Sequence, residues 1–272
     1  MKNKSIFVAG LILALALCLP AATTGKKTTQ SKKKTSPAVS RTKQQKAKPG
    51  SAAKFFVKAG YAMGMSANSQ DSSWTEPLYG ENIQYALANK AGKSSNIELG
   101  LGYNLGRTFA VGLGAILLSG NLDAALDASV PHPWVFASPR SASGTYAGKL
   151  KSTVLYLNFI YRLAVSKFTV DVFAGPAYFN SSADILNAVT IQDAFPNETV
   201  TLSLATENTK KSSFGFNAGA GVNYFFAKSL GVFLEARYLS GSGAFTASSG
   251  TVPEIKLTVG GLNVGAGLLF RF

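Results

Sequence analysis

From Phe55 onward, apolar residues alternate with small or polar residues in eight runs, and no stretch carries apolar residues at helical spacing. Successive side chains of a β-strand point to opposite faces, so a period of two predicts strands with one apolar face. We therefore expect a nearly all-β structure. The runs cover residues 55–67, 96–105, 109–120, 151–163, 168–180, 212–226, 230–241 and 254–272.

The connections between these runs alternate in length. Three of them, "GRT", "AVSK" and "AKS", are short enough to be hairpin turns. The others are long, rich in Ser, Asn, Asp, Ala and Pro, and span about 69–95, 121–150, 181–211 and 242–253. Short turns at one end and long loops at the other predict an eight-stranded, antiparallel, up-and-down barrel.

The two faces of the predicted strands differ in composition. One face is apolar and uncharged, whereas the opposite face combines charged residues with many of the 27 glycines. A soluble barrel would turn its apolar face inward, but a solvated outer face has no need for glycine, which costs about 0.5–1 kcal/mol relative to alanine. Aromatic residues also gather near the short turns, as in the girdle of a membrane barrel. The pattern favours an apolar face turned towards lipid and a lumen holding glycine and charge.

The first 25 residues are typical of a secretory signal peptide, with Lys2 and Lys4 ahead of an apolar run from Ile6 to Leu19. We expect no other segment to cross a bilayer as a helix. The single cysteine, Cys18, raises a lipoprotein signal as the alternative, but Leu17 occupies a position where such signals resemble one another in having a small residue. After ordinary cleavage the chain would have no thiol for disulfides or metal binding.

Most of the net charge of +14 belongs to residues 26–54, which contain ten Lys or Arg and no acid. This segment has almost no large apolar residues, so we expect it to be disordered in the periplasm. One interpretation is a solvated spacer, and the other is an electrostatic tether to an anionic polymer of the envelope. Nucleic acid is not expected as a partner of an exported chain.

The chain from 55 to 272 resembles the eight-stranded outer-membrane barrels of the opacity-protein and outer-membrane protein A and X group. The stretch that begins "GFNAGAGVNYFFAKSLGVFLEARYL" at Gly215 is similar to the penultimate hairpin of such barrels. The last strand resembles their assembly signal, which the barrel assembly machinery would read. Its residues are Val264, Ala266, Leu268, Phe270 and Phe272. The resemblance implies a place in the bacterial outer membrane, in contact with its lipids. The basic segment departs from the family pattern, as does the lack of a peptidoglycan-binding domain.

The inward face is expected to hold a network of ion pairs. Its predicted members are Lys58, Glu98, Arg162, Asp171, Glu235, Arg237 and Arg271. The interior of an eight-stranded barrel is just wide enough for side chains to fill, so these charges should plug it and satisfy one another. The alternative is a gated ion path, as in a small porin-like diffusion channel.

Catalytic residues, a metal site and a cofactor are not expected. The only histidine, His132, lies between two prolines, and no acid is placed to orient its ring towards Ser129 or Ser138. A lone histidine also lacks the partners of a metal site. A lipid-modifying enzyme of the outer membrane is the least favoured alternative.

The long connections are the remaining candidates for function, because binding residues tend to lie on loops held by a rigid scaffold. Trp74, Trp134 and Arg140 are the candidate contact residues, towards a host or a neighbouring cell. Packing within the loops, or a hairpin extending above the membrane, would explain these residues equally well. The leading hypothesis is a non-enzymatic outer-membrane barrel that supports envelope integrity or surface interaction.

Overall fold

The computed structural model describes residues 54–65, 69–166, 168–194, 196, 198–249 and 252–272. The predicted signal peptide (1–25) and the basic segment (26–54), apart from Lys54, lie outside the described residues. The strands are β1 (Phe55–Gly64), β2 (Ser69–Leu78), β3 (Glu81–Asn104), β4 (Phe109–Val130), β5 (Arg140–Val165), β6 (Phe168–Ala194), β7 (Thr199–Phe225), β8 (Leu230–Phe245) and β9 (Ile255–Arg271). The described part of the chain contains no helix that could span a membrane.

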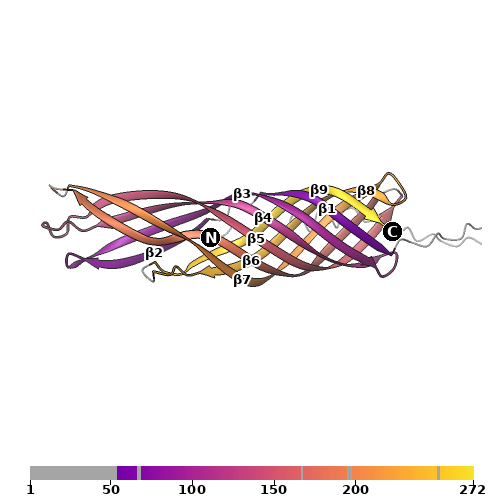
Figure 1. Ribbon diagram of the computed structural model, residues 1–272, viewed down its shortest axis with the longest axis horizontal. Helices are drawn as coiled ribbons and strands as arrows, with labels where there is room; N and C mark the ends of the chain where they lie inside the picture. Colours follow the sequence, from indigo (N-terminus) through magenta and orange to yellow (C-terminus); the bar gives the residue numbers. More distant parts are fainter. Residues whose placement is uncertain (1–53, 66–68, 167, 195, 197, 250–251) are drawn as a thin grey trace, which may run out of the picture. The chain divides into compact units, whose positions relative to one another are not determined.

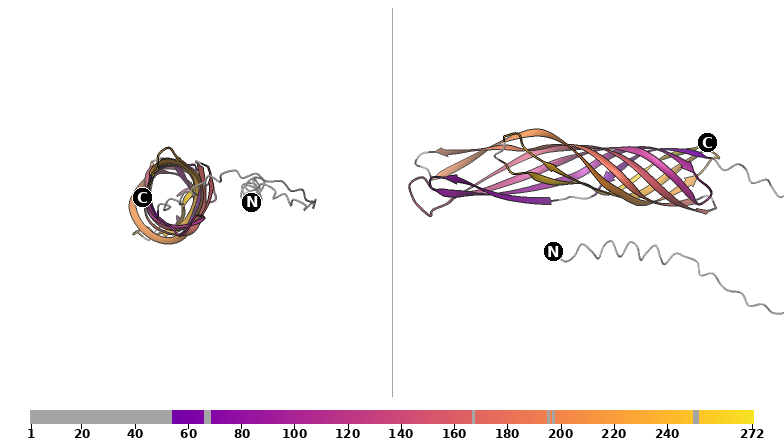
Figure 2. Two further views of the ribbon diagram at one scale, coloured as in Figure 1. Left: turned by 90° about the vertical axis from the view of Figure 1, so that its right-hand side faces the viewer. Right: turned by 90° about the horizontal axis from the view of Figure 1, so that it is seen from below.

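The strands form one antiparallel sheet that closes on itself (Figures 1 and 2). Its order is β1-β9-β8-β7-β6-β5-β4-β3-β2, and β1 also pairs with β3, which closes the ring. The strands β1 and β2 share one position in the barrel wall, because both pair with β3. The strand β1 pairs with residues 94–103 of β3, and β2 pairs with residues 81–90. Nine strands thus fill the eight positions of the predicted barrel.

The predicted long loops are mostly strand, which corrects the expected boundaries. Both β6 and β7 are 27 residues long, and the connections that remain at this end of the barrel are residues 79–80, 131–139, 195–198 and 246–254. We call the end with the hairpin turns the short-turn half and the other end the long-strand half. The alternating stretch "TVTLSLAT" (199–206) lies in β7 and extends the barrel beyond the predicted run 212–226.

The apolar face changes sides between the two halves. In the short-turn half large apolar side chains point outward, and Leu99 and Phe159 are 57% and 64% exposed. In the long-strand half they point inward, so that Leu87 and Leu126 are almost fully buried. On β3 the change accompanies a bulge between Ala91 and Ser94. The segments predicted as loops therefore have the pattern of water-soluble strands, with Ser, Asn, Thr and Lys outside.

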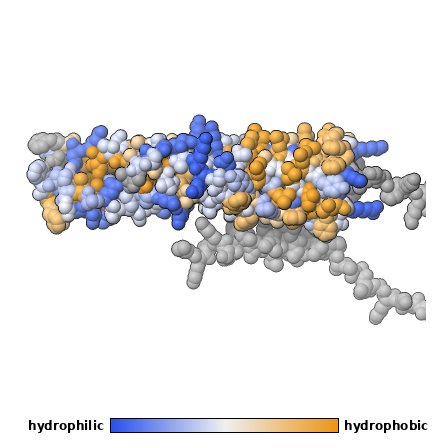
Figure 3. Space-filling view, turned by 60° about the horizontal axis from the view of Figure 1, so that its bottom comes forward, coloured by the Kyte–Doolittle hydropathy of each residue, from blue (hydrophilic) through white to orange (hydrophobic). Residues whose placement is uncertain are grey.

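The outward apolar residues of the short-turn half form a belt, and Figure 3 shows one side of it. Cross-strand aromatic pairs, such as Phe55 with Tyr103 and Phe109 with Tyr161, lie at its short-turn edge. Their rings are 5.0 and 5.6 Å apart between centroids. The aromatic girdle thus lies where the sequence predicts it. A belt of this kind is suited to the hydrocarbon of a bilayer.

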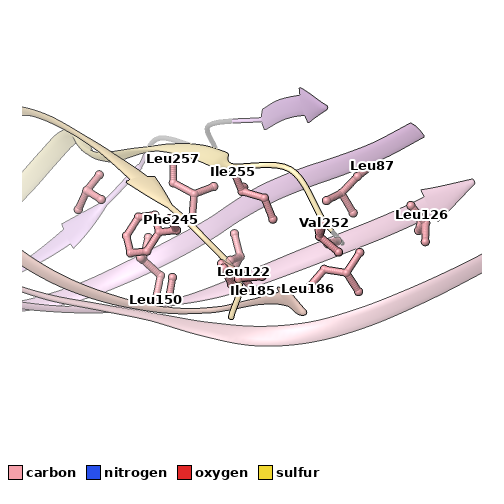
Figure 4. Packing of buried hydrophobic residues seen from close by; sticks show 14 of the residues in the cluster. Leu87, Leu122, Leu126, Leu150, Ile185, Leu186, Phe245, Val252, Ile255 and Leu257 are labelled. Atoms are coloured by element: carbon pink, nitrogen blue, oxygen red, sulfur yellow. The ribbon is translucent and has the colours of Figure 1, made fainter. Parts of the chain in front are cut away.

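An apolar core fills the long-strand half, and the connection between β8 and β9 closes part of it (Figure 4). Phe245, Ala247 and Val252 are buried against side chains of the surrounding wall, and Val252 is only 4% exposed. Hydrogen bonds fix this connection to the wall. The Ser249 hydroxyl donates to the Asn187 carbonyl, and the Ser248 hydroxyl donates to Glu207 at 2.6 Å.

Glycines of the short-turn half make room for aromatic rings that cross the lumen. A Cβ atom added at Gly102 would overlap the Phe56 ring, and one added at Gly219 would come within 2.7 Å of the Phe173 ring. The sequence predicts small residues beside long charged ones, and the structure shows that ring packing demands them as well. Phe56, Phe173 and Phe233 belong to a second buried cluster at this level.

Candidate functional site

Four of the predicted lumen charges meet in one cluster. The Arg237 guanidinium donates to Glu98 at 2.6 Å and to Glu235 at 2.8 Å, and the Lys58 ammonium donates to Glu235 at 2.7 Å. Tyr156 adds a hydroxyl that donates to Glu98 at 2.5 Å. The cluster contains two acids and two bases, so its formal charge is zero.

Aromatic rings and close packing seal the lumen around this cluster. The Arg237 guanidinium lies over the rings of Tyr156 and Phe173, 4.3 and 4.9 Å from their centroids, and the Lys58 ammonium lies 4.4 Å from that of Phe233. The voids beside the cluster measure about 10 and 20 Å³, which is room for about one water molecule each. At this level the interior is filled by side chains, as the width of an eight-stranded barrel requires.

The other three predicted charges lie closer to the short-turn end. Arg162 forms a two-point ion pair with Asp171, at 2.7 and 2.8 Å, from directly opposite positions on β5 and β6. Arg271 belongs to neither group, because its Nε donates to the Lys228 carbonyl and its guanidinium lies over the Phe225 ring. Arg162 and Arg271 both line an open cavity of about 830 Å³ at the short-turn end. The predicted set of seven is therefore divided into a cluster, a pair and a residue at the cavity mouth.

The lumen also has uncharged members, which the pattern of charge does not predict. Tyr156 is the most important of these, and the side-chain amide of Asn96 donates to Asn263 at 2.5 Å farther towards the long-strand half. All three occupy inward positions, so the alternation could have identified them. These residues are uncharged, so a pattern of charge alone does not identify them.

The last strand closes the barrel. The main chains of Phe272 and Phe55 exchange two hydrogen bonds of 3.0 Å, and their rings stack. The predicted assembly residues Val264, Leu268, Phe270 and Phe272 are all exposed. They share the lipid-facing side of β9, and their recognition by the assembly machinery stays a prediction.

At the far end of the long-strand half, Arg140 is a wall residue and not a free contact. Its guanidinium donates to Asp193 at 2.6 Å and to the Pro131 carbonyl at 2.8 Å, and the Tyr79 hydroxyl donates to Asp193 at 2.9 Å. Partial burial raises the pKa of Asp193, but the hydrogen bonds from Arg140 and Tyr79 outweigh it and leave this pKa below its ordinary value. The hydrogen bond to Asp193 and burial together raise the pKa of Tyr79.

These interactions fix the connection between β4 and β5, which carries Trp134. Nδ1 of His132 accepts hydrogen bonds from the backbone N–H groups of Trp134 and Val135, at 3.1 and 3.0 Å. Glu81 accepts the N–H of Ala137 at 2.7 Å. Trp134 and Phe136 are 81% and 80% exposed despite this anchoring. We call Trp134, Val135 and Phe136 the apolar tip.

Trp74, the third candidate contact residue, faces the interior. Its ring stacks on Tyr85, with 4.8 Å between the centroids, and packs against the apolar core of the long-strand half. Burial raises the pKa of Tyr85 to about 12. The structure thus places Trp134 outside, Arg140 beneath the apolar tip and Trp74 in the wall.

A closed antiparallel sheet with a lipid-suited belt and a filled, paired interior defines a transmembrane β-barrel. The family model described as "Outer membrane protein beta-barrel domain" matches residues 9–270. The protein belongs to this family of the bacterial outer membrane.

Solved structures of other outer-membrane proteins are similar to this chain at low sequence identity. OprG of Pseudomonas aeruginosa is 14% identical with a TM-score of 0.48, over 81% of this chain and 96% of its own. The attachment invasion locus protein Ail of Yersinia pestis, solved with the heparin analogue sucrose octasulfate, is 12% identical with a TM-score of 0.36, over 81% and 100%. The outer membrane protease OmpT of Escherichia coli is 9% identical with a TM-score of 0.38, over 80% and 97%. These likenesses concern the fold alone, and no curated protein matches the sequence.

Proposed function

We propose that the protein is a closed, non-enzymatic outer-membrane barrel that makes surface contacts through the apolar tip at its long-strand end. The observation that carries this proposal is the combination of anchoring and exposure at residues 131–139. Large aromatic side chains normally avoid water, yet Trp134 and Phe136 project from a connection that at least four hydrogen bonds hold in place. A preorganised aromatic pair suits a binding contact, because little conformational entropy is lost when it docks.

The proposal places the long-strand end outside the cell and the short turns in the periplasm, in the usual orientation of such barrels. The basic segment would then lie in the periplasm, within reach of anionic envelope polymers. The last strand would be the one that the barrel assembly machinery reads.

The geometry of His132 supports a structural role over a catalytic one. A general base needs a ring nitrogen free to take a proton from its nucleophile. Nδ1 accepts two backbone N–H groups, so the neutral ring carries its proton on Nε2 and neither nitrogen is free to act as a base. No cluster of three or more potential metal ligands occurs within the described residues.

The filled lumen argues against the alternative of a diffusion channel. An ion would have to pass the sealed charge cluster and then the apolar core of the long-strand half, where it would lose its hydration shell. Recording from the purified protein in planar bilayers tests this point, and the expected result is no current above that of the bilayer alone. Steady unitary conductance would contradict a closed barrel and indicate a channel.

The surface-contact proposal is tested by adherence. Cells that display the wild type, W134S/F136S or the control E198Q are compared for adherence to epithelial monolayers and for aggregation with one another. Glu198 is an exposed residue of the neighbouring connection, so its substitution alters the same end without touching the apolar tip. We expect W134S/F136S alone to lower adherence or aggregation severalfold at equal surface display. Equal values for all three proteins would reject the apolar tip as the contact.

A further inference from the structure

Lysines lie directly beyond the lipid-facing belt, on its long-strand side. On three alternate strands, an exposed lysine stands four residues outside the outermost large apolar residue of the belt. These pairs are Lys93 with Ile97 on β3, Lys151 with Leu155 on β5, and Lys210 with Phe214 on β7. Four residues is an even number, so Lys151 and Lys210 emerge from the same face of the wall as their belt residues. Lys93 lies in the bulge of β3, where it is exposed as well. Figure 3 shows a hydrophilic zone directly beside the apolar belt.

Two of these lysines converge across adjacent strands. Lys151 of β5 lies opposite Ser182 of β6, which in turn lies opposite Lys210 of β7. The two lysine backbones are therefore about 10 Å apart, two strand spacings, and their flexible stems can bring both ammonium groups to one anion. Ser182 donates its hydroxyl to Asn208 at 3.0 Å, which leaves the serine oxygen free to accept.

The charge in this area is unbalanced. Lys149 is exposed two residues from Lys151 and on the same face of β5, and the nearest acid on β5, β6 and β7 is Asp184. Asp184 already accepts the backbone N–H of Lys149 and the side-chain amide of Asn208, both at 2.8 Å. Within the described residues Lys149, Lys151 and Lys210 form no ion pair. Three like charges around one acid repel one another, and an anionic ligand would remove that cost.

The depth of the cluster points to the class of ligand. Four residues extend about 13 Å along a strand, or about 9 Å along the axis of a barrel with strands tilted by about 45°. The head-group layer of a phospholipid is only about 5–8 Å thick. Sugar-borne phosphates extend farther from the acyl chains than a phospholipid phosphate does. The hydroxyl and amide groups of Ser182, Asn208 and Ser119, which lies opposite Lys151, suit sugar hydroxyls.

We propose that Lys151 and Lys210, with Ser182 between them, bind a phosphate on the sugar head group of a phosphorylated glycolipid in the leaflet at the long-strand edge of the belt. The acyl chains of this lipid would lie along Phe214 and Leu155. The site belongs to a different surface from the apolar tip and does not depend on the proposed surface contact.

Native mass spectrometry of the purified mature protein in detergent micelles tests the proposal. The protein is titrated with bisphosphorylated lipid A, with its dephosphorylated form and with phosphatidylglycerol. The variants are K151Q/K210Q and the charge-matched control K90Q/K256Q, whose lysines are exposed in the same half but outside the cluster. Heat-modifiable gel mobility is measured in parallel, and all variants are expected to retain the folded band.

A lysine near an anionic lipid surface strengthens binding about fivefold, so the double substitution should weaken lipid A binding about 25-fold. We expect the control to change it by less than about threefold, and dephosphorylation to abolish the difference between variants. Equal affinity of the wild type and K151Q/K210Q for lipid A would overturn the site. An equal loss of affinity of K151Q/K210Q for phosphatidylglycerol would overturn the assignment of the ligand as a glycolipid and indicate a general phosphate site. Loss of adherence in W134S/F136S is scored separately, so either proposal can fail alone.

Discussion

Removing Arg237 should destabilise the barrel more than any surface substitution. This arginine is 3% exposed and contacts both Glu98 and Glu235. In R237M the cluster holds two carboxylates and one ammonium, Lys58, and its formal charge falls from zero to minus one. The neighbouring voids, at about 10 and 20 Å³, cannot admit enough water to solvate the uncompensated carboxylate. Removing one partner of a buried ion pair costs about 3–5 kcal/mol of stability, and we expect the free energy of unfolding to fall by this amount.

The measurement is urea unfolding of the purified protein in lipid vesicles, followed by tryptophan fluorescence and by gel mobility. Arg107 lies exposed in the turn between β3 and β4, so R107M serves as the control and should change stability by less than about 0.5 kcal/mol. Adding E98Q to R237M restores neutrality, because Lys58 and Glu235 remain paired. The double variant should therefore recover about 1–3 kcal/mol of the loss. A loss below about 1 kcal/mol in R237M, or no recovery with E98Q, would refute a charge-balanced cluster as a source of stability.

Three further predictions concern other parts of the barrel. G102A should destabilise by about 1–3 kcal/mol, because the new methyl group would overlap the Phe56 ring, whereas G106A, with no atom within 4 Å of the added Cβ, should be neutral in the same unfolding assay. The lowered pKa of Asp193 means that its stabilising contribution is complete above the ordinary aspartate pKa of 3.8 and is lost as the pH falls through the still lower folded value. The difference in stability between the wild type and D193N in the same unfolding assay should therefore be present above about pH 3.8 and shrink as the pH falls below it; equal stability of the two proteins at neutral pH would show that Asp193 does not stabilise this end of the barrel. F272A should lower the amount of folded barrel in the membrane severalfold if the last strand is an assembly signal, and an equal yield of the heat-modifiable band would contradict that role.

The short-turn half could be predicted from the sequence almost residue by residue. A bilayer requires every strand to turn its apolar side chains outward. The outward orientation of Leu99, Phe159 and Leu268 can therefore be predicted from each strand alone. The short turns follow because only three or four residues separate the runs. The paired acids and bases follow because charge inside a narrow barrel has no other partner.

The strands of the long-strand half could not be predicted from the sequence, for a physical reason. Beyond the bilayer the outward face meets water, so the apolar face turns inward and residues such as Ser, Asn and Lys take the outside. The same composition is typical of loops, and the bulges near Ala91 and Leu186 interrupt the alternation further. Trp74 illustrates the result, because a tryptophan in a predicted loop suggests a contact, whereas the strand places it beside Tyr85 in the wall.

The two halves seal the lumen by different physics, and this has a consequence for permeability. The short-turn half is closed by paired charges and aromatic rings, whereas the long-strand half is closed by an apolar core that includes Phe245 and Val252. The seals lie in series and meet at Tyr156, which packs in the apolar core and donates its hydroxyl to Glu98. Removing Arg237 should therefore weaken folding without opening an ion path, because the apolar core still excludes hydrated ions. A barrel with two seals in series is better suited to presenting its outer surface than to passing solutes through its centre.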